Sequence, residues 1–353
     1  MIKVAALTSG RDVPSARFRV RQHIEPLQRA GICVREHLPL IEKYAPPPPF
    51  LTFSNRSAAA PLRIAWKCAK ILARIPGVIG SWKARITWLE REMHPGWLTF
   101  EPLLKRPLLF DVDDAIWLTP PIGRRAAIKI AKMADVLIAG NHFIAEWFST
   151  YAKDVRIVPT AVDTDRIRPR HFPGLGSPDR GFVVGWTGTS SNYDSLYQIE
   201  KALEQFLTNR NAELVVIADQ PPRFSHLKPE RVRYVKWSPD MEIRALEWMD
   251  VGLMPLPFNE WSMGKCSFKM LQYMAAGLPV VVSPVGMNAE VMSMGDIGLS
   301  AVTPADWYEA LTTLYDDRAF GYRCGAEGRL IVEKRFSRSV VSMILADIFR
   351  EFV

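Results

Sequence analysis

The chain of 353 residues is long enough for two domains, and its 48% hydrophobic and 23% charged residues are typical of a globular protein. No run of about 18 apolar residues predicts a membrane-spanning helix, and the first residues, MIKVAALTSG, lack the long apolar stretch of a signal peptide. The four scattered cysteines argue against a zinc site or a disulfide framework and fit a reducing cytoplasm, and the net charge is +8.

The first half of the chain alternates strands with helices. Strands are expected at 3–7, 32–35, 108–112, 136–139 and 155–158, and helices at 16–30, 123–133 and 141–152. This order predicts a parallel α/β sheet. The loop after the first strand contains Gly10 and Ser15, and the next helix begins with Arg17, Arg19 and Arg21.

Positive charge is concentrated in residues 1–165, which hold 24 Lys and Arg against 15 Asp and Glu, whereas residues 166–353 hold 21 against 22. No acidic residue lies between Glu42 and Glu90, and cations alternate there with Trp and Ile. We expect residues 62–91 to form a basic helical region that contacts an anionic membrane surface. The alternative is an amphipathic helix pair packed on its own domain; nucleic acid is not expected as a partner.

A Pro- and Gly-rich linker at 169–178 precedes a second series of elements. Strands are expected at 182–186, 213–217, 232–235, 251–254 and 280–283, and helices at 193–208, 240–249, 268–276 and 305–316. The predicted fold class is α/β, with two Rossmann-like doubly wound domains, 1–165 and 166–336, facing across a cleft. The last helix, within 337–353, is expected to pack back on the first domain.

The stretch GKCSFKMLQYMAAGLP, beginning at Gly264, predicts a short helix with Ser267 as its N-cap and Gly277 as its C-terminal stop. Lys265 and Lys269 lie at its start, where free N–H groups already carry partial positive charge. Together they predict an anion site. Two surface lysines without a ligand are the alternative.

The stretch GWTGTSSN follows the first strand of the second series and contains Trp186, Gly188 and Thr189. Gly188 allows close backbone approach, and the Thr and Ser hydroxyls can bind phosphate. This loop and the start of the helix at 268 are predicted to hold a diphosphate. The alternative is a turn whose Gly and Ser serve only its own geometry.

Three carboxylates, Asp111, Asp113 and Asp114, end one strand of the first half. They repel each other unless a metal, an arginine or substrate hydroxyls compensate. We expect Asp113 or Asp114 to bind sugar hydroxyls or to accept the acceptor proton, without a metal. The alternative is a helix cap, or pairing with Arg17 or Arg19.

Several of these motifs resemble those of one enzyme family. LQYMAAGLPVVVSPVGMNAEV, preceded by GKCSFKM, resembles the donor-site region of GT-B glycosyltransferases of the glycosyltransferase-4 group, and VRIVPTAVDTDRIRP resembles their interdomain linker. PSARFRVRQ and FDVDDAIW resemble first-domain motifs of one bacterial branch. The resemblance implies sugar transfer from a nucleotide diphosphate donor, with retention of anomeric configuration and without metal or cofactor.

The resemblance also implies roles for particular residues. It places Lys269 on the helix face toward the donor and Gln272 where the family often has a ribose-binding Glu. An earlier family Glu is replaced by Gly264, so the chain departs at both acids, and Lys265 is expected to supply a missing cation. The predicted catalytic residues are Asp113, Asp114 and Lys269. The predicted donor contacts are Gly10, Ser15, Arg17, Trp186, Gly188, Thr189, Gly264, Lys265, Ser267, Lys269 and Gln272.

We therefore expect a cytoplasmic glycosyltransferase, peripheral on the inner face of the membrane, that uses a nucleotide-sugar donor and a glycan or lipid-linked acceptor in bacterial envelope polysaccharide biosynthesis. Preorganised cations would stabilise the leaving diphosphate most strongly in the transition state. The alternatives are a nucleotide-sugar 2-epimerase, which shares the fold, and an inactive homologue acting as a membrane-associated partner in polysaccharide assembly.

Overall fold

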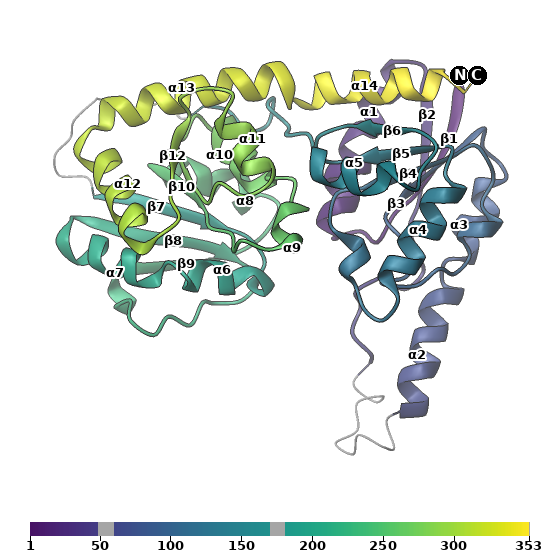
Figure 1. The fold of residues 1–353 in the computed structure, drawn as a ribbon, viewed down its shortest axis with the longest axis horizontal. Coiled ribbons are helices and arrows are strands. Elements are labelled where there is room, and N and C mark those ends of the chain that lie inside the picture. Colours follow the sequence, from purple (N-terminus) through teal and green to yellow (C-terminus); the bar gives the residue numbers. More distant parts are fainter. Residues whose placement is uncertain (49–59, 170–180, 353) are drawn as a thin grey trace. The chain divides into compact units, whose positions relative to one another are not determined.

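The computed structural model describes residues 1–48, 60–169 and 181–352, and it divides into two units (Figure 1). Unit 1 comprises Met1–Ala161, the short segment Gly264–Cys266 and the C-terminal segment from Arg338; unit 2 comprises Val162–Met263 and Ser267–Ser337. Each unit is built on a six-stranded parallel sheet. The predicted fold class, α/β with two Rossmann-like domains, is confirmed.

The sheet of unit 1 has the strand order β2-β1-β3-β4-β5-β6. Its strands are β1 (Ile2–Leu7), β2 (Ile32–His37), β3 (Ile86–Glu90), β4 (Leu108–Val112), β5 (Val136–Ala139) and β6 (Val155–Ile157). The central strands β3 and β4 are buried along their whole length, which is typical of a parallel sheet covered on both faces. Strand β3 was not predicted from the sequence.

The helices of unit 1 are α1 (Ile24–Arg29), α2 (Ala60–Leu72), α3 (Ile75–Ser81), α4 (Gly123–Met133), α5 (His142–Ser149) and α14 (Arg338–Arg350). Before α1 the chain forms a π-helical turn and then a 3-10 turn, so the single helix predicted at 16–30 is wrong in its details. The C-terminal helix α14 packs on α1 within unit 1. Its Ser342 hydroxyl lies 2.7 Å from Nδ1 of the buried His23.

The prediction of a basic helical region at 62–91 is correct over α2 and α3. It is wrong over Ile86–Glu90, which form strand β3. Trp88, expected on an amphipathic surface, is fully buried in the core of unit 1, where its ring meets Phe349 of α14 edge-on. The segment around Trp88 therefore belongs to the sheet. Helix α2 extends away from that sheet (Figure 1).

The sheet of unit 2 has the strand order β12-β11-β10-β7-β8-β9. Its strands are β7 (Phe182–Thr187), β8 (Ala212–Ala218), β9 (Val232–Lys236), β10 (Val251–Met254), β11 (Val280–Val282) and β12 (Gly298–Ser300). All five predicted strands of this half are present. The edge strand β12 was not predicted, since three residues carry little periodicity.

Eight helices are described in unit 2: α6 (Tyr193–Tyr197), α7 (Glu200–Asn209), α8 (Met241–Arg244), α9 (Glu260–Met263), α10 (Phe268–Ala275), α11 (Met287–Met292), α12 (Pro304–Asp316) and α13 (Arg318–Arg335). The long helix α13 was not predicted. Its Arg329 donates to the carbonyls of Thr164, Ile167 and Ala275, and so joins the chain after β6 to the end of α10.

Within the described residues, no helix is both long enough and apolar enough to cross a bilayer.

Candidate functional site

The sheet of unit 2 changes its winding direction between β7 and β10. Strands β7, β8 and β9 lead to one edge, and β10 returns to the other side of β7. The loops that leave the carboxyl ends of β7 and β10 therefore diverge, which creates the usual ligand position of such sheets. One of these loops contains Gly188 and Thr189, and the other leads through α9 toward α10.

Lys269, in the first turn of α10, reaches the end of β7. Its ammonium lies 5.0 Å from the centre of the Trp186 ring, and its Cε lies where a side chain on residue 188 would begin. A Cβ at Gly188 would be only 2.8 Å from Lys269 Cε and 2.6 Å from the Trp186 ring. A side chain at residue 188 would therefore displace Lys269 or the Trp186 ring, and the predicted pairing of these two motifs has a direct structural basis.

Tyr273 fixes α10 in this position. It lies one turn after Lys269 on the same face of the helix. Its ring packs on the Cα of Gly252 in β10, where a Cβ would be 2.1 Å away, and its hydroxyl accepts a hydrogen bond from the N–H of Thr187 at 2.9 Å. The buried Tyr273 thus anchors α10 in the position that places Lys269 against the end of β7.

Trp186 and Ser267 differ from their predicted surroundings. The Trp186 side chain is 1% exposed and belongs to the core of unit 2, so it supports Lys269 rather than presenting a face to solvent. Ser267 occupies the N-cap position of α10, as predicted, and its carbonyl accepts from the N–H of Leu271. Its hydroxyl does not cap the helix, however, because the backbone is left-handed, with φ of 50°, and the hydroxyl donates to Oδ1 of the buried Asn288 at 2.7 Å.

The C-terminal stop of α10 is confirmed. Gly277 has φ of 70°, its N–H donates to the carbonyl of Met274, and the N–H of Leu278 donates to that of Tyr273. This is the double hydrogen bond of a Schellman motif, which favours glycine at the left-handed position.

Gln272 is 4% exposed, and its amide donates to Oε1 of Glu242 at 2.7 Å. The other carboxylate oxygen of Glu242 accepts from Trp237 Nε1 at 3.1 Å. A buried carboxylate from α8 therefore lies against the position where the resemblance implied an acid.

The hydroxyls of the loop after β7 bond within or beside the loop. Thr189 Oγ1 lies 2.8 Å from Ser191 Oγ, and the N–H of Ser190 donates to Asp219 at 2.6 Å. Burial would raise the pKa of Asp219, but the hydrogen bonds from Ser190 outweigh it and lower that pKa. These bonds pre-form the turn, and Thr189 itself is exposed.

In unit 1 the winding changes between β1 and β3. The N–H of Ser9, after β1, donates to Oε2 of Glu90 at the end of β3 at 2.8 Å. Gly10 offers its carbonyl to Arg21. The hydroxyl of Ser15 is buried and finds no hydrogen-bond partner among the described residues. Arg17 is half-buried, with its guanidinium 4.7 Å from the Phe18 ring.

Asp111 is the first of the three carboxylates at β4. It is fully buried, with Arg19 Nε donating to it at 2.8 Å and Trp88 Nε1 at 3.1 Å. Burial raises the pKa of Asp111 to about 6, while Arg19 acts in the opposite direction. The buried contact between Arg19 and Asp111 holds the π-helical turn before α1 to the sheet.

Asp113 and Asp114 are joined by Arg91, a residue that was not predicted from the sequence. Arg91 donates to Asp113 Oδ1 at 2.5 Å and to Asp114 Oδ2 at 3.0 Å. Burial would raise the pKa of Asp113, but the Arg91 guanidinium outweighs it and lowers that pKa. The two carboxylates are thus paired with an arginine, but the predicted partners, Arg17 and Arg19, are wrong: the partner is Arg91, and Arg19 pairs with Asp111.

The segment Gly264–Cys266 also meets this acidic loop within unit 1. Lys265 Nζ lies 3.2 Å from Asp114 Oδ1, and Cys266 Sγ donates to the carbonyl of Asp113. A Cβ on Gly264 would lie 2.7 Å from the N of Ala115. Close packing therefore explains the glycine at 264, and Lys265 has a carboxylate partner.

The backbone conformation of Arg91 was also not predicted. Arg91 has φ of 53°, a conformation that L-residues seldom adopt, and this places its side chain at the carboxyl end of β3. A run of Glu90, Arg91 and Glu92 after an apolar stretch is the signal that could have located it. Across the described ranges, no cluster of three or more His, Cys, Asp or Glu side chains is arranged to hold a metal ion.

Two parallel α/β units, each with polar residues at the carboxyl edge of its sheet, are the architecture of the GT-B fold. Residues 181–317 match the model of the family described as Glycosyl transferases group 1. Unit 2 therefore carries the sequence pattern of that family, and the predicted resemblance to GT-B glycosyltransferases is confirmed. No curated protein sequence matches the chain.

Solved structures share the fold over the whole chain. Sucrose-phosphate synthase from Thermosynechococcus elongatus is 14% identical with a TM-score of 0.70, covering 99% of each chain. HepE from Anabaena, in complex with UDP and glucose, is 13% identical with a TM-score of 0.68, covering 99% of this chain and 100% of its own. A glycosyltransferase from Rickettsia africae is 12% identical with a TM-score of 0.65, covering 99% and 98%.

Proposed function

We propose that the protein transfers a sugar from a nucleoside diphosphate sugar to a glycan or lipid-linked glycan, with retention of configuration and without a metal. The donor diphosphate binds at the carboxyl edge of the sheet of unit 2, against Lys269 and the loop at Gly188. UDP-glucose is the first donor to test, because HepE has been solved in complex with it.

The observation that carries this proposal is that the Lys269 side chain packs directly against Gly188 at the end of β7. Lys269 is half-buried, and its ammonium lies beside the winding switch of a parallel sheet. Tyr273 anchors its helix there, and Gly188 leaves room for its side chain. When the bond between sugar and phosphate breaks, negative charge grows on the leaving diphosphate. A fixed cation at that point stabilises the transition state more than the bound donor.

The acceptor is proposed to bind at the carboxyl edge of unit 1. The unsatisfied Ser15 hydroxyl and the carboxylates of Asp113 and Asp114 are groups that bind sugar hydroxyls. Arg91 holds these two carboxylates in place and supplies the positive charge that a metal would otherwise provide.

The membrane contact is proposed to involve α2 and α3, on the cytoplasmic face. Large apolar side chains are exposed there, with Ile64 64% and Ile79 57% exposed, and no acidic residue occurs between Glu42 and Glu90. An apolar surface with basic neighbours and no acid is suited to an anionic bilayer. A lipid-linked acceptor would then be within reach of the enzyme.

The test is turnover by the Lys269→Ala variant. Release of nucleoside diphosphate would be measured with UDP-, ADP- and GDP-sugars, and kcat/KM is expected to fall about 100-fold or more. The matched control is Lys201→Ala, which removes an exposed lysine of α7 and should leave turnover unchanged.

Equal turnover of the two variants would remove Lys269 from the mechanism. A wild-type chain that releases no diphosphate from any of these donors, yet is folded, would favour the inactive homologue. Interconversion of the sugar at C2 without an acceptor would favour the epimerase.

A further inference from the structure

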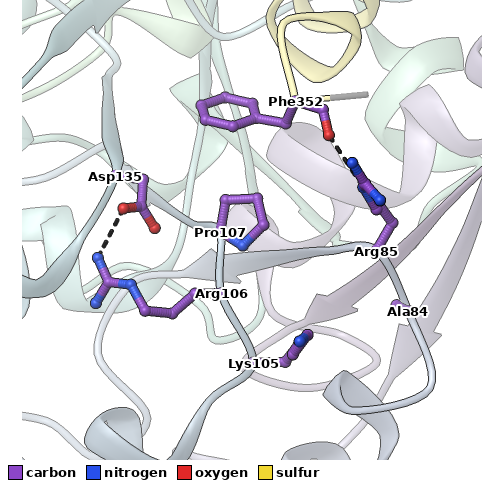
Figure 2. Close-up of a pocket in the computed structure, with 7 residues that line it drawn as sticks. All are labelled: Ala84, Arg85, Lys105, Arg106, Pro107, Asp135 and Phe352. Carbon is purple, nitrogen blue, oxygen red and sulfur yellow. Dashed lines mark hydrogen bonds and ion pairs between the residues drawn. The ribbon is translucent and has the colours of Figure 1, made fainter.

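A pocket of about 520 Å³ opens at the amino edge of the sheet of unit 1 (Figure 2). Its lining residues are Ala84, Arg85, Lys105, Arg106, Pro107, Asp135 and Phe352. Three of them, Arg85, Pro107 and Asp135, directly precede strands β3, β4 and β5. The pocket therefore lies at the opposite edge from Ser15 and Asp113, and the proposed transfer reaction does not use it.

The pocket is cationic, with three basic side chains against one carboxylate. Arg106 Nη2 donates to Asp135 Oδ1 at 2.8 Å, and the other oxygen of Asp135 accepts from the N–H of Leu108 at 2.8 Å. The single carboxylate is thus already paired. Arg85 Nε donates to the carbonyl of Phe352 at 3.2 Å, which uses one of five guanidinium N–H groups. Arginine and lysine donors around a cavity suit an anion with several oxygens, such as phosphate.

One wall of the pocket continues into an exposed apolar surface. Lys105 Nζ lies 5.4 Å from the centre of the Trp82 ring, and Trp82 is 62% exposed. The indole N–H donates to the carbonyl of Leu103 at 2.9 Å, so the polar atom of the ring is satisfied while its apolar face remains open. Leu103 and Ile79 are 56% and 57% exposed.

We propose that this pocket binds the phosphate group of an anionic phospholipid while Trp82, Leu103 and Ile79 enter the interfacial layer of the bilayer. A free phosphate would use the cations alone, whereas a lipid uses both the cations and the apolar surface next to them. Tryptophan is enriched at this depth of membranes because one side of it is apolar and the other is polar. The inference deepens the membrane contact proposed above and adds a defined headgroup site to it.

The test compares two double variants of the full chain that lose the same charge. Arg85→Gln/Lys105→Gln removes two cations from the pocket, and Arg124→Gln/Lys129→Gln removes two exposed cations from α4. Sedimentation would be measured with vesicles of phosphatidylcholine alone and of phosphatidylcholine with phosphatidylglycerol. The pocket variant is expected to bind the anionic vesicles about 25-fold more weakly, at about fivefold per cation, and the control less than about threefold more weakly. Trp82→Ala is expected to weaken binding as well.

Several outcomes would overturn the inference. Equal weakening by the two double variants would mean that general charge and not the pocket is responsible. If inorganic phosphate raises the melting temperature of the wild type but not of the pocket variant, and vesicle binding is the same in both, the pocket is a site for free phosphate and not for lipid. A wild type that sediments with no vesicle refutes the membrane contact as a whole. Nucleoside diphosphate release, measured without vesicles, then still decides the proposed transferase separately.

Discussion

Arg91 shows how one side chain determines what two carboxylates can do. Asp113 and Asp114 lie side by side at the end of β4, and an uncompensated pair of this kind would protonate or recruit another cation. Arg91 bonds to both of them from the end of β3, and Lys265 adds a second cation on Asp114. The two carboxylates are therefore paired with cations and held in a fixed orientation, which is what binding of sugar hydroxyls requires.

Replacement of Arg91 is expected to be costly. Arg91→Met should lower the free energy of unfolding by about 3–5 kcal/mol, because it leaves two buried carboxylates with too little positive charge. The measurement is urea denaturation at pH 7. Arg156→Met is the matched control: Arg156 also forms a two-pronged pair, with Asp154, but its side chain is 43% exposed, so at most about 1 kcal/mol is expected. A similar loss in both variants would show that Arg91 is no more important than a surface pair.

Gly188 is the second residue whose identity is explained by a neighbour. Gly188→Ala would place a methyl group within 2.8 Å of Lys269 Cε and 2.6 Å of the buried Trp186 ring. We expect a loss of about 1–3 kcal/mol of stability from overpacking, and a fall in kcat/KM of about tenfold or more because the lysine is displaced. Gly181→Ala, where the nearest atom is 3.4 Å away, is the control. A Gly188→Ala variant that is destabilised but turns over donor normally would contradict the role given to Lys269.

At the scale of elements, α14 is held to the first unit by a titratable contact. His23 lies in the turn before α1, is 1% exposed and meets Ser342 of α14. Burial lowers the pKa of His23 to about 3, and the charge of Arg19 acts in the same direction. The unfolded chain, with an ordinary pKa of about 6.5, takes up the proton first as the pH falls. The contribution of His23 to the free energy of unfolding is therefore fully present above about pH 6.5 and is lost progressively as the pH falls toward 3.

The expected size of this effect follows from the pKa difference. At pH 5.5 the protonation of His23 in the unfolded chain should cost about 1.4 kcal/mol. We predict that the drop in unfolding free energy between pH 7.5 and 5.5 is smaller by that amount in His23→Asn than in the wild type. The other histidines are the same in both chains and cancel in this comparison. Parallel pH profiles would mean that His23 is not the buried neutral group described here.

The elements that the sequence predicted correctly are those whose local signals agree with their packing. Helix α10 ends where Gly277 and Pro279 indicate, because the left-handed turn needs no tertiary partner. Helix α13 was missed because it contains three glycines, which count against a helix. The structure explains one of them: Gly325 lies against the carbonyl of Gly277, where a Cβ would be 2.0 Å away.

Strand β3 and the contact between Lys269 and Gly188 show more clearly what could not be predicted from the sequence. The residues of β3 follow a cationic stretch and contain Trp88, so they suggested a surface helix, whereas the sheet buries them. The motifs at Gly188 and Lys269 were each weak in the sequence, and only the sheet order brings them together. Arg91, which follows β3, bonds to Asp113 and Asp114, and Glu242 of α8 bonds to Gln272 of α10. No local sequence pattern specifies such contacts between separate elements.

At the scale of the whole molecule, charge is divided between the two halves of the chain. Residues 1–165 carry a net charge of +9 and residues 166–353 carry −1, counted as Lys and Arg against Asp and Glu. A basic half of this kind attracts an anionic surface over distances set by the ionic strength. The screening length falls from about 30 Å at 0.01 M salt to about 8 Å at 0.15 M.

Binding to anionic vesicles is therefore expected to depend strongly on salt. Raising NaCl from about 0.01 to 0.15 M should weaken the affinity for vesicles with phosphatidylglycerol at least about tenfold, because charges beyond the first contact layer are screened. Residual binding to phosphatidylcholine alone, which depends on apolar side chains such as Ile64 and Trp82, should change little over the same range. Sedimentation at several salt concentrations measures both. An affinity for anionic vesicles that does not vary with salt would mean that the uneven charge of the chain is not what brings it to a membrane, and the apolar surface would have to account for the contact by itself.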